Sequence, residues 1–487
     1  MDSTDAHGPS AGSSFRFGFV AADRPLTLRD LPGWVQESFG PLDLHRHPDT
    51  RWAAASEGDA AVGLIGDPVD LNTGSADPQA ISRQVAKVLS VSGLDSALRH
   101  VAYLGGRWTA LLRSGDHLLV VPDFAATQSV YWHHSTDGTV LASHTHLLAE
   151  VTGAEVNKPL RTLMTQARDH GAKGTIYWPG METPFIGEFP LLPNHALHLR
   201  TGQEPQHRRF YPFPDTDLVR DPDQAYARFR DLFLEHARLL CAGRTRMGIS
   251  LTAGADSRTS LAAAAPHLPA DQTWTWTYMD TTVHHEGMAA DAAAARQVAQ
   301  HYGLPHQIVD LRQDGLQALS SPTEFGECYK RTMKLTQQFR RLSVAYHEQL
   351  PSDLTELMSL VAEVGTGFYK RRSGTPDPDR LLHLYQPTEF SQQPLIRQAF
   401  ERYAEYSGLS AVQDGPIDWH DLYYQESRIG RWASLRIQEM DLAHRVLLPF
   451  NARGIVEALG GPALEDRVQK QALHRLMADL GAPAPGA

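Results

Sequence analysis

The stretch of sequence that decides the fold runs Gly248-Ile-Ser-Leu-Thr-Ala-Gly-Ala-Asp-Ser-Arg-Thr-Ser-Leu261. The apolar run 247–251 predicts a buried strand, and the Ala-rich run 257–265 predicts a helix. The small side chains between them would leave successive backbone N–H groups and the helix N-terminus facing whatever fills the loop. The segment is therefore a candidate cradle for an anion.

The residue types in this loop suit phosphates held together with a metal ion. Gly254 allows close backbone approach, Thr252 and Ser257 offer hydroxyl groups, and Asp256 offers a carboxylate for Mg2+. The alternative interpretation is an ordinary strand–helix turn capped by Asp256 or Ser257. No Gly-Lys-Ser/Thr follows, so the loop differs from the type used in γ-phosphoryl transfer.

Helix and strand patterns alternate on both sides of the loop. Helical spacing is expected at about 225–240 and 289–302, and strands are expected at 273–278 and 306–311. This alternation predicts a doubly wound α/β fold. The chain becomes mainly helical after residue 320.

The first part of the chain has a different pattern, in which short β-type segments are separated by turns. These segments are 17–20, 61–65, 108–112, 117–121, 129–133, 140–143 and 196–199. They predict a layered β-rich domain over 15–205, with the proline-rich stretch 202–223 connecting it to a second domain over 206–480. Residues 1–14 and 481–487 are small, polar and turn-prone, so we expect them to be disordered.

Composition excludes several classes of function. A net charge of -11 without a long basic run argues against nucleic-acid binding, and we interpret the patch Lys370-Arg-Arg372 as solvated loop charge. No apolar run is long enough to span a bilayer. The cysteines are Cys241 and Cys328, which cannot form a disulfide framework, and no signal peptide is recognisable. We therefore expect a cytoplasmic protein. The 24 histidines lack zinc-site spacing.

The loop resembles the Ser-Gly-Gly-x-Asp-Ser pyrophosphate motif of class B asparagine synthetases, β-lactam synthetases and lasso-peptide cyclases. Thr252 stands in place of Ser and Ala253 in place of the first Gly. The segments 104–110, 118–123, 185–195 and 449–451 resemble that family in the same order. The resemblance implies a degenerate glutaminase-like domain with an Ntn-hydrolase-like sandwich fold, followed by an ATP-pyrophosphatase domain of the adenine nucleotide α-hydrolase-like type.

The resemblance also implies ATP and Mg2+ as ligands. The residues it assigns to ATP are Ser250, Leu251, Thr252, Gly254, Asp256, Ser257, Thr277 and Ser359. Glu363, in the segment Glu363-Val-Gly-Thr-Gly-Phe-Tyr369, resembles the acid of a second pyrophosphate loop that shares the metal with Asp256. Lys470 resembles the lysine that stabilises charge on the adenylate. The alternatives are a surface or helix-capping glutamate and an exposed helical lysine.

Two departures from the family pattern bear on mechanism. Phe17-Gly18-Phe19 stands where a glutaminase begins with a nucleophilic cysteine, and the segment 63–67 differs where glutamine would bind, so no glutaminase activity is expected. Leu360 occupies the position of the usual general base. Tyr329, Glu327 and Glu426 are the alternatives for that role.

The resemblance therefore implies an ATP- and Mg-dependent ligase or cyclase that adenylates a carboxylate, releases AMP and pyrophosphate and forms an amide bond. The context expected is natural-product biosynthesis of lasso-peptide or β-lactam type. Its substrate would be a small molecule or peptide bearing a carboxylate and an amine, with pathway proteins as further partners. The alternatives are an ammonia-dependent asparagine synthetase-type enzyme and a degenerate binding protein. Intramolecular and intermolecular amide formation both stay open.

Overall fold

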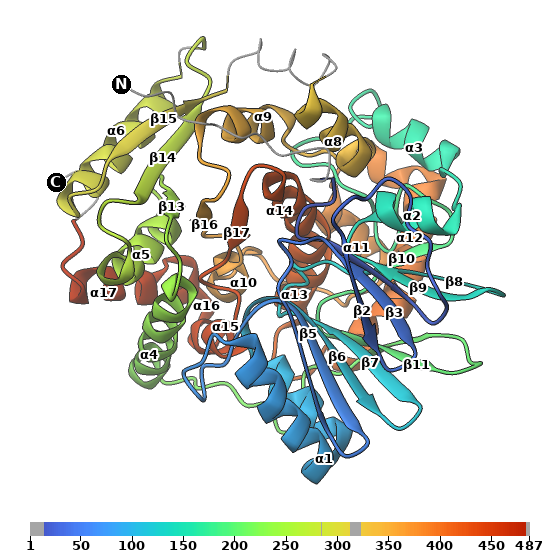
Figure 1. Ribbon diagram of the computed structural model, residues 1–487. Coiled ribbons are helices and arrows are strands. Elements are labelled where there is room, and N and C mark those ends of the chain that lie inside the picture. Colours follow the sequence, from blue (N-terminus) through green and yellow to red (C-terminus); the bar gives the residue numbers. More distant parts are fainter. Residues whose placement is uncertain (1–13, 284, 312–322, 484–487) are drawn as a thin grey trace.

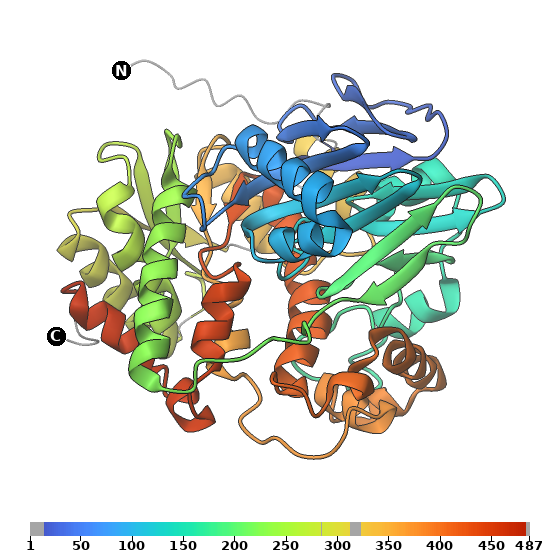
Figure 2. The same ribbon diagram turned by 90° about the horizontal axis from the view of Figure 1, so that it is seen from below.

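The computed structural model describes residues 14–283, 285–311 and 323–483 (Figure 1). The expected disordered segments 1–14 and 481–487 lie outside these ranges, apart from Ser14 and residues 481–483. The remaining chain has a β-rich first part and an α/β second part, which lie on opposite sides of the molecule in Figures 1 and 2.

The first part contains two antiparallel six-stranded sheets. The first sheet has the order β10 (Glu188–Pro190), β8 (Tyr131–Ser135), β9 (Gly138–Ala142), β1 (Phe19–Ala22), β3 (Leu42–Arg46) and β2 (Val35–Phe39). The second has the order β12 (Gln206–Arg209), β11 (His195–Arg200), β7 (His117–Pro122), β6 (Gly105–Ser114), β5 (Ala60–Val69) and β4 (Trp52–Glu57). Since β12 follows residue 205, this second sheet includes residues that the sequence assigned to the connection between domains.

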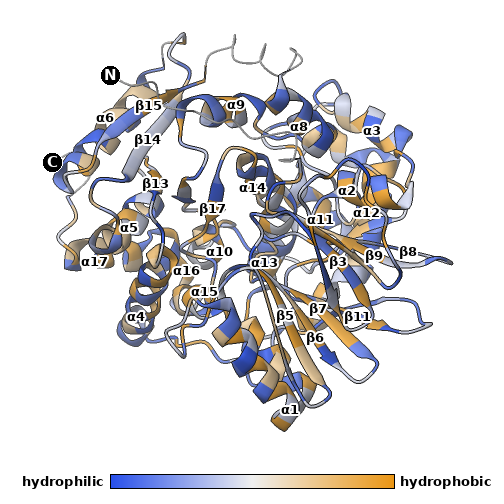
Figure 3. Ribbon diagram, viewed as in Figure 1, coloured by the Kyte–Doolittle hydropathy of each residue, from blue (hydrophilic) through white to orange (hydrophobic). Residues whose placement is uncertain are grey.

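The two sheets pack face to face, and a helical layer covers the outer face of each, which gives four layers. This packing is possible because the strands are apolar on both faces. Alternate residues of β5, such as Val62 and Leu64, face helix α1 (Pro78–Ala102), whereas Ala61 and Ile65 face the first sheet. Helix α2 (Thr145–Thr152) covers the outer face of the first sheet. Figure 3 shows the apolar colour of the central strands β5 to β7. The prediction of a layered β-rich first part is confirmed.

The second part is built on a parallel five-stranded sheet with the order β15 (His306–Asp310), β14 (Thr273–Met279), β13 (Met247–Ser250), β16 (Thr355–Leu357) and β17 (Arg445–Leu447). Helices α4 (Pro222–Cys241), α5 (Ala255–Ala264) and α6 (Glu286–His301) cover one face through Leu240, Leu261 and Val298. Helices α9 (Arg340–Gln349) and α14 (Ser434–Asp441) pack on the other face, where Trp276 meets Tyr346. The predicted α/β alternation is confirmed.

Further helices surround this framework. They are α3 (Lys158–Thr165), α8 (Glu324–Met333), α10 (Ala362–Thr366), α11 (Pro378–Tyr385), α12 (Pro394–Ser407), α13 (Trp419–Tyr423), α15 (Arg453–Gly460), α16 (Leu464–Val468), α17 (Gln471–Asp479), the 3-10 helices Ala265–His267, Glu389–Gln392 and Leu409–Val412, and the π-helix Tyr424–Ala433. The π-helix continues directly into α14. No helix in the described ranges is long and apolar enough to cross a membrane.

Candidate active site

The loop after β13 lies at the carboxyl end of the parallel sheet. Leu251 N donates to Trp276 O (2.7 Å), which extends the pairing of β13 with β14 to the edge of the loop. Helix α5 then begins with Gly254 at its N-cap and has no side-chain cap. Ser257 nevertheless holds the turn, because its Oγ accepts a hydrogen bond from Thr252 N, so the alternative of a strand–helix turn capped by Ser257 stays open. The first N–H groups of α5 have no acceptor within the helix and carry its positive partial charge.

The amides before α5 are already bound within the protein. Thr252 N donates to Ser257 Oγ (3.1 Å), and Gly254 N donates to Thr252 Oγ1 (3.1 Å). Ala253 N donates to a carboxylate oxygen of Asp291, which belongs to α6. The sequence patterns did not predict this contact of Asp291. The Asp291 carboxylate thus already accepts the hydrogen bond of one loop amide. The N–H groups in the first turn of α5 remain for a ligand.

Lys470 and Asp256 form an ion pair across the sheet edge. Lys470 Nζ lies 2.6 Å and 2.8 Å from the two carboxylate oxygens of Asp256, and the two side chains are 29% and 19% exposed. Lys470 precedes α17 with a left-handed φ of 55°. That conformation costs an L-residue ~1–2 kcal/mol, and strain of this kind concentrates at functional sites. The alternative of an exposed helical lysine is therefore wrong.

Glu363 lies close enough to this pair to share its electrostatics. Burial raises the pKa of Glu363, the negative charge of Asp256 raises it further, and Lys470 lowers it. Its Oε2 atom is buried and has no hydrogen-bond partner among the residues that the structure describes. Glu363 lies in the first turn of the short helix α10, and the N-cap residue Val361 has a φ of 81°, which is an outlier for a β-branched residue. The structure therefore brings Asp256, Glu363 and Lys470 together.

The two carboxylates fit part of a divalent-cation site. A cation would give the buried Oε2 of Glu363 the partner it lacks, and Asp256 would supply a second oxygen ligand. In the described part of the chain, no group of three or more His, Cys, Asp or Glu side chains could hold a metal. A cation here would therefore rely on water and on oxygens of a substrate, as Mg2+ commonly does.

The side chains of the other residues assigned to ATP form hydrogen bonds with protein groups or are buried. Thr277 Oγ1 donates to Leu251 O (2.8 Å), and Ser359 Oγ donates to Ser260 Oγ (2.8 Å). Leu251 is buried, and Ser250 ends β13. These contacts fasten the carboxyl ends of β14 and β16 to the loop and to α5. The two hydroxyls therefore shape the site instead of standing free within it.

The candidate bases are engaged elsewhere. Glu426 forms a two-pronged ion pair with Arg209 (2.7 Å for both contacts), and Tyr329 donates to buried Glu439. Glu327 is exposed and pairs with Lys330 (2.8 Å).

Two residues of the π-helix, Tyr424 and Arg428, lie near Glu363 instead. Arg428 lowers the pKa of Glu363. Burial and the charge of Glu363 raise the pKa of the Tyr424 hydroxyl well above its ordinary value, so this hydroxyl keeps its proton. Sequence reasoning had missed both residues, because no motif in the π-helix indicated that it packs beside α10.

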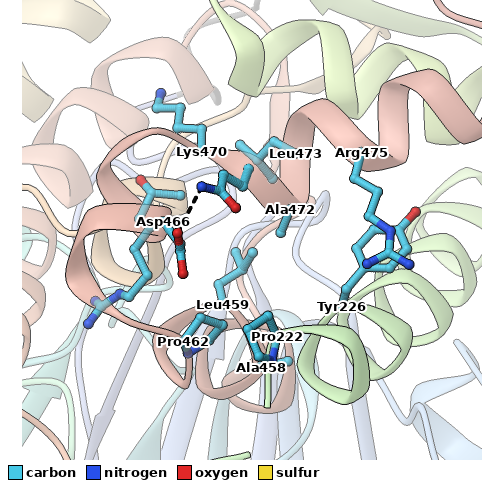
Figure 4. Close-up of a pocket in the computed structure, with 13 residues that line it drawn as sticks. Pro222, Tyr226, Ala458, Leu459, Pro462, Asp466, Lys470, Ala472, Leu473 and Arg475 are labelled. Atoms are coloured by element: carbon cyan, nitrogen blue, oxygen red, sulfur yellow. Dashed lines mark hydrogen bonds between the residues drawn. The ribbon is translucent and has the colours of Figure 1, made fainter. Parts of the chain in front are cut away.

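A pocket of about 200 Å³ lies behind Lys470 (Figure 4). Pro222, Leu459 and Pro462 form its apolar side, and the side chain of Lys470 extends away from them. The guanidinium of Arg475 covers the Tyr226 ring at 4.0 Å on another side. The pocket therefore borders the backbone of Lys470, while the ammonium faces Asp256.

No protein-family model and no curated protein matches the chain. Similar solved structures include a glutamine phosphoribosylpyrophosphate amidotransferase from B. subtilis complexed with ADP and GMP (10% identity, 72% of this chain and 76% of that chain, TM-score 0.25). They also include a glutamine-dependent NAD+ synthetase from Acinetobacter baumannii in complex with ADP (11%, 40% and 38%, TM-score 0.18) and an NMN synthetase from Francisella tularensis (11%, 45% and 94%, TM-score 0.20). TM-scores this low do not establish a common fold.

Proposed function

We propose that the protein is an ATP-dependent carbon–nitrogen ligase that activates a carboxylate as an acyl-adenylate. The observation that carries this proposal is the meeting of Asp256, Glu363 and Lys470 beside the uncapped N-terminus of α5. Three separate segments supply these groups, and Val361 and Lys470 hold strained backbone conformations there. A helix N-terminus, an ammonium group and two carboxylates are the groups that nucleotide phosphates with a divalent cation require.

The proposed reaction has two steps. An oxygen of the substrate carboxylate attacks the α-phosphorus of ATP, and the bond to pyrophosphate breaks. An amine nitrogen then attacks the acyl carbon, loses a proton and displaces AMP. The N–H groups of α5 and the Lys470 ammonium bind phosphate oxygens and stabilise the charge that develops. Asp256 and Glu363 would hold Mg2+, which would neutralise phosphate charge.

We propose that the amine belongs to the substrate or to a second substrate and does not come from glutamine. Phe17, at the position of the expected nucleophile, has no thiol and lies between two guanidinium groups, with Arg16 at 4.8 Å and Arg445 at 4.7 Å from its ring centroid. Asp67, in the segment where glutamine would bind, pairs with Arg51, Arg244 and Arg445. Side chains therefore fill the region that would have to receive glutamine.

The proposed setting is the biosynthesis of a natural product of lasso-peptide or β-lactam type, in which the substrate is a small molecule or peptide and other pathway proteins are partners. The hydrogen bond from Ala253 N to Asp291 favours a second candidate, a binding protein without turnover, because it blocks one loop amide. Nucleotide binding and turnover therefore need separate measurements.

Substitution of Asp256 by Asn tests the ligase directly. Calorimetry should show that the native protein binds ATP in the presence of Mg2+, and that Asp256→Asn weakens this binding by at least ~10-fold. Pyrophosphate–ATP exchange, assayed with a panel of carboxylic acids, should be lost in the variant while its circular dichroism stays native. Asp353→Asn is the matched control, because Asp353 is 60% exposed and pairs with exposed Arg246.

Two results would contradict the proposal. Absence of ATP binding by the native protein would exclude both the ligase and a nucleotide-binding protein. Retention of exchange activity by Asp256→Asn would show that this carboxylate is not part of the catalytic site.

A further inference from the structure

Arginine and aromatic side chains form a continuous series along the π-helix and α14. These two helices supply Arg428, Trp432 and Arg436, and other segments supply the remaining rings. In order of contact, the series is Phe368, Arg428, Trp432, Phe339, Arg436 and Tyr278. The Arg428 guanidinium lies 5.5 Å from the Phe368 ring centroid and 4.8 Å from that of Trp432. The Arg436 guanidinium lies 4.7 Å from the Phe339 ring centroid and 6.0 Å from that of Tyr278. The rings of Trp432 and Phe339 join the two arginines at 6.0 Å.

This arginine–aromatic series starts beside the candidate active site. Phe368 stacks on Tyr424 with ring centroids 4.3 Å apart, and Arg428 acts electrostatically on Glu363. At its other end, Tyr278 lies near the carboxyl end of β14, the strand next to β13. Phe368 is 44% exposed, and Phe339 and Tyr278 are half-buried. The series therefore runs along the edge of the sheet where the nucleotide loop lies.

Arg428 and Arg436 have no ion-pair partner in the described part of the chain, a feature that they share with the buried Arg431 and Arg453. Arg107, Arg445 and Arg467 each form an ion pair with an aspartate. By contrast, Arg428 Nη2 donates to Thr175 Oγ1 (3.1 Å) and Arg436 Nη2 to Tyr278 OH (3.2 Å), and neither arginine forms an ion pair with any residue in the described ranges. The chain has a net charge of -11, so acidic side chains are not scarce.

Unused hydrogen-bond donors accompany these unpaired charges. Arg436 is only 9% exposed, and its buried Nε has no hydrogen-bond partner within the described ranges. Trp432 Nε1, between the two arginines, is also buried without a partner. Glu356 and Glu439 act on Arg436 electrostatically but form no ion pair with it in the described ranges. Buried N–H groups without acceptors cost free energy, so the two unpartnered donors together point to a ligand that supplies oxygens.

We propose that Arg428 and Arg436 recognise two carboxylate groups of an extended, peptide-like substrate, with Arg428 holding the group nearer the reacting centre. This proposal rests on the proposed ligase function. The two residues are eight positions apart, which is roughly 10–12 Å along a helix. An extended peptide spans ~3.3–3.6 Å per residue, so the carboxylates would lie about three residues apart. A single small amino acid is too short to reach both arginines.

ATP is the other source of anionic oxygens, so the experiment separates peptide from nucleotide. The probes are the peptides acetyl-Glu-Gly-Gly-Glu-amide and acetyl-Gln-Gly-Gly-Gln-amide, and ATP with Mg2+ is titrated separately. Calorimetry on the full chain should show that the glutamate peptide binds at least ~10-fold more tightly than the glutamine peptide. Arg428→Met and Arg436→Met should each remove at least ~10-fold of that affinity, and Arg436→Met, at the position farther from Glu363, should change ATP binding by less than about twofold.

Two further variants control for folding and charge. Arg83→Met removes an exposed arginine of α1 and should leave both affinities unchanged. Arg436→Lys keeps the positive charge of this buried position and should lose less affinity than Arg436→Met, provided that circular dichroism shows both to be folded.

Equal affinity for the two peptides would overturn the proposal, and so would arginine variants that weaken ATP binding but not peptide binding. Native protein that binds ATP but does not discriminate between the peptides would refute only the substrate assignment. Selective peptide binding without any ATP binding would refute the ligase and leave the carboxylate site in place.

Discussion

At the scale of single residues, backbone conformation separates the role of Lys470 from that of an ordinary surface lysine. Its φ of 55° lies in the region that glycine adopts without strain. The ammonium is part of a partly buried ion pair, which contributes at most ~1 kcal/mol to stability. The free-energy cost of the left-handed backbone and the contribution of the ammonium can therefore be measured separately, by comparing two substitutions of Lys470.

Lys470→Ala and Lys470→Gly should have equally low pyrophosphate-exchange activity, because both remove the ammonium. Lys470→Gly should nevertheless be more stable to urea by ~1 kcal/mol, since it relieves the left-handed strain that Lys470→Ala retains. Equal stability of the two variants would show that no strain is stored at this position. Exchange activity in Lys470→Gly would show that the ammonium is not needed.

Sequence patterns predicted the charged residues of the site better than their surroundings. Asp256, Glu363 and Lys470 lie in short motifs, so each could be identified locally before the fold was known. The contacts of Asp291, Arg428 and Arg436 could not be predicted, because they depend on how α6, the π-helix and α14 pack around the sheet. The hydrogen bonds of the Thr277 and Ser359 hydroxyls to Leu251 and Ser260 likewise depend on tertiary packing, so the sequence did not predict them.

At the scale of secondary-structure elements, the sequence predicted the long, regular helices and strands, and it missed elements that are very short or interrupted. The regular patterns of α4, β13, α5, β14, α6 and β15 were all predicted close to their observed bounds. Strands β16 and β17 have three residues each, too few for a periodic signal. Helix α1 was missed, and it contains Gly93 in a non-helical conformation (φ 80°, ψ -179°) that breaks its pattern.

Strand β10 places a carboxyl group where it cannot ionise easily. Glu188 is 2% exposed, and in the described part of the chain neither of its oxygens has a hydrogen-bond partner. Burial raises the pKa of Glu188 to about 9, although nearby Thr183 lowers it in part. Between the ordinary value of 4.5 and this raised value, the unfolded chain releases the proton and the folded chain keeps it. The contribution of Glu188 to stability is therefore complete at low pH and is lost as the pH rises through the folded-state pKa.

We expect Glu188→Gln to flatten this dependence. Over about pH 5 to 8, Glu188 makes the free energy of unfolding of the native protein fall by up to ~1.4 kcal/mol per pH unit, and the variant should lack this component. Urea titrations at several pH values measure both slopes. Glu204→Gln, at an exposed position between β11 and β12, is the control and should keep the native slope. A Glu188→Gln slope equal to the native one would contradict the assignment.

At the scale of the whole molecule, buried polar contacts join the antiparallel sheets to the parallel sheet. Arg107 of β6 pairs with Asp441 of α14, with contacts of 2.8 Å and 2.5 Å, and both side chains are 2% exposed. Asn451 Nδ2 donates to Gly106 O (2.6 Å) beside this pair. Because α14 follows the π-helix directly, this interface also fixes the helix that carries Arg428. The β-rich part therefore supports the candidate site even without chemistry of its own.

Asp441→Ala should destabilise both parts of the molecule together. The substitution leaves the Arg107 guanidinium buried without its carboxylate, which costs ~3–5 kcal/mol in comparable pairs. If the interface couples the two parts, far-UV circular dichroism and tryptophan fluorescence should report one shared urea transition that moves to lower concentration in the variant. Asp353→Ala, which removes an exposed partner of Arg246, should change stability by ~1 kcal/mol or less. Two separate transitions, of which only one responds to Asp441→Ala, would mean that the parts fold independently and that the β-rich part does not hold α14 in place.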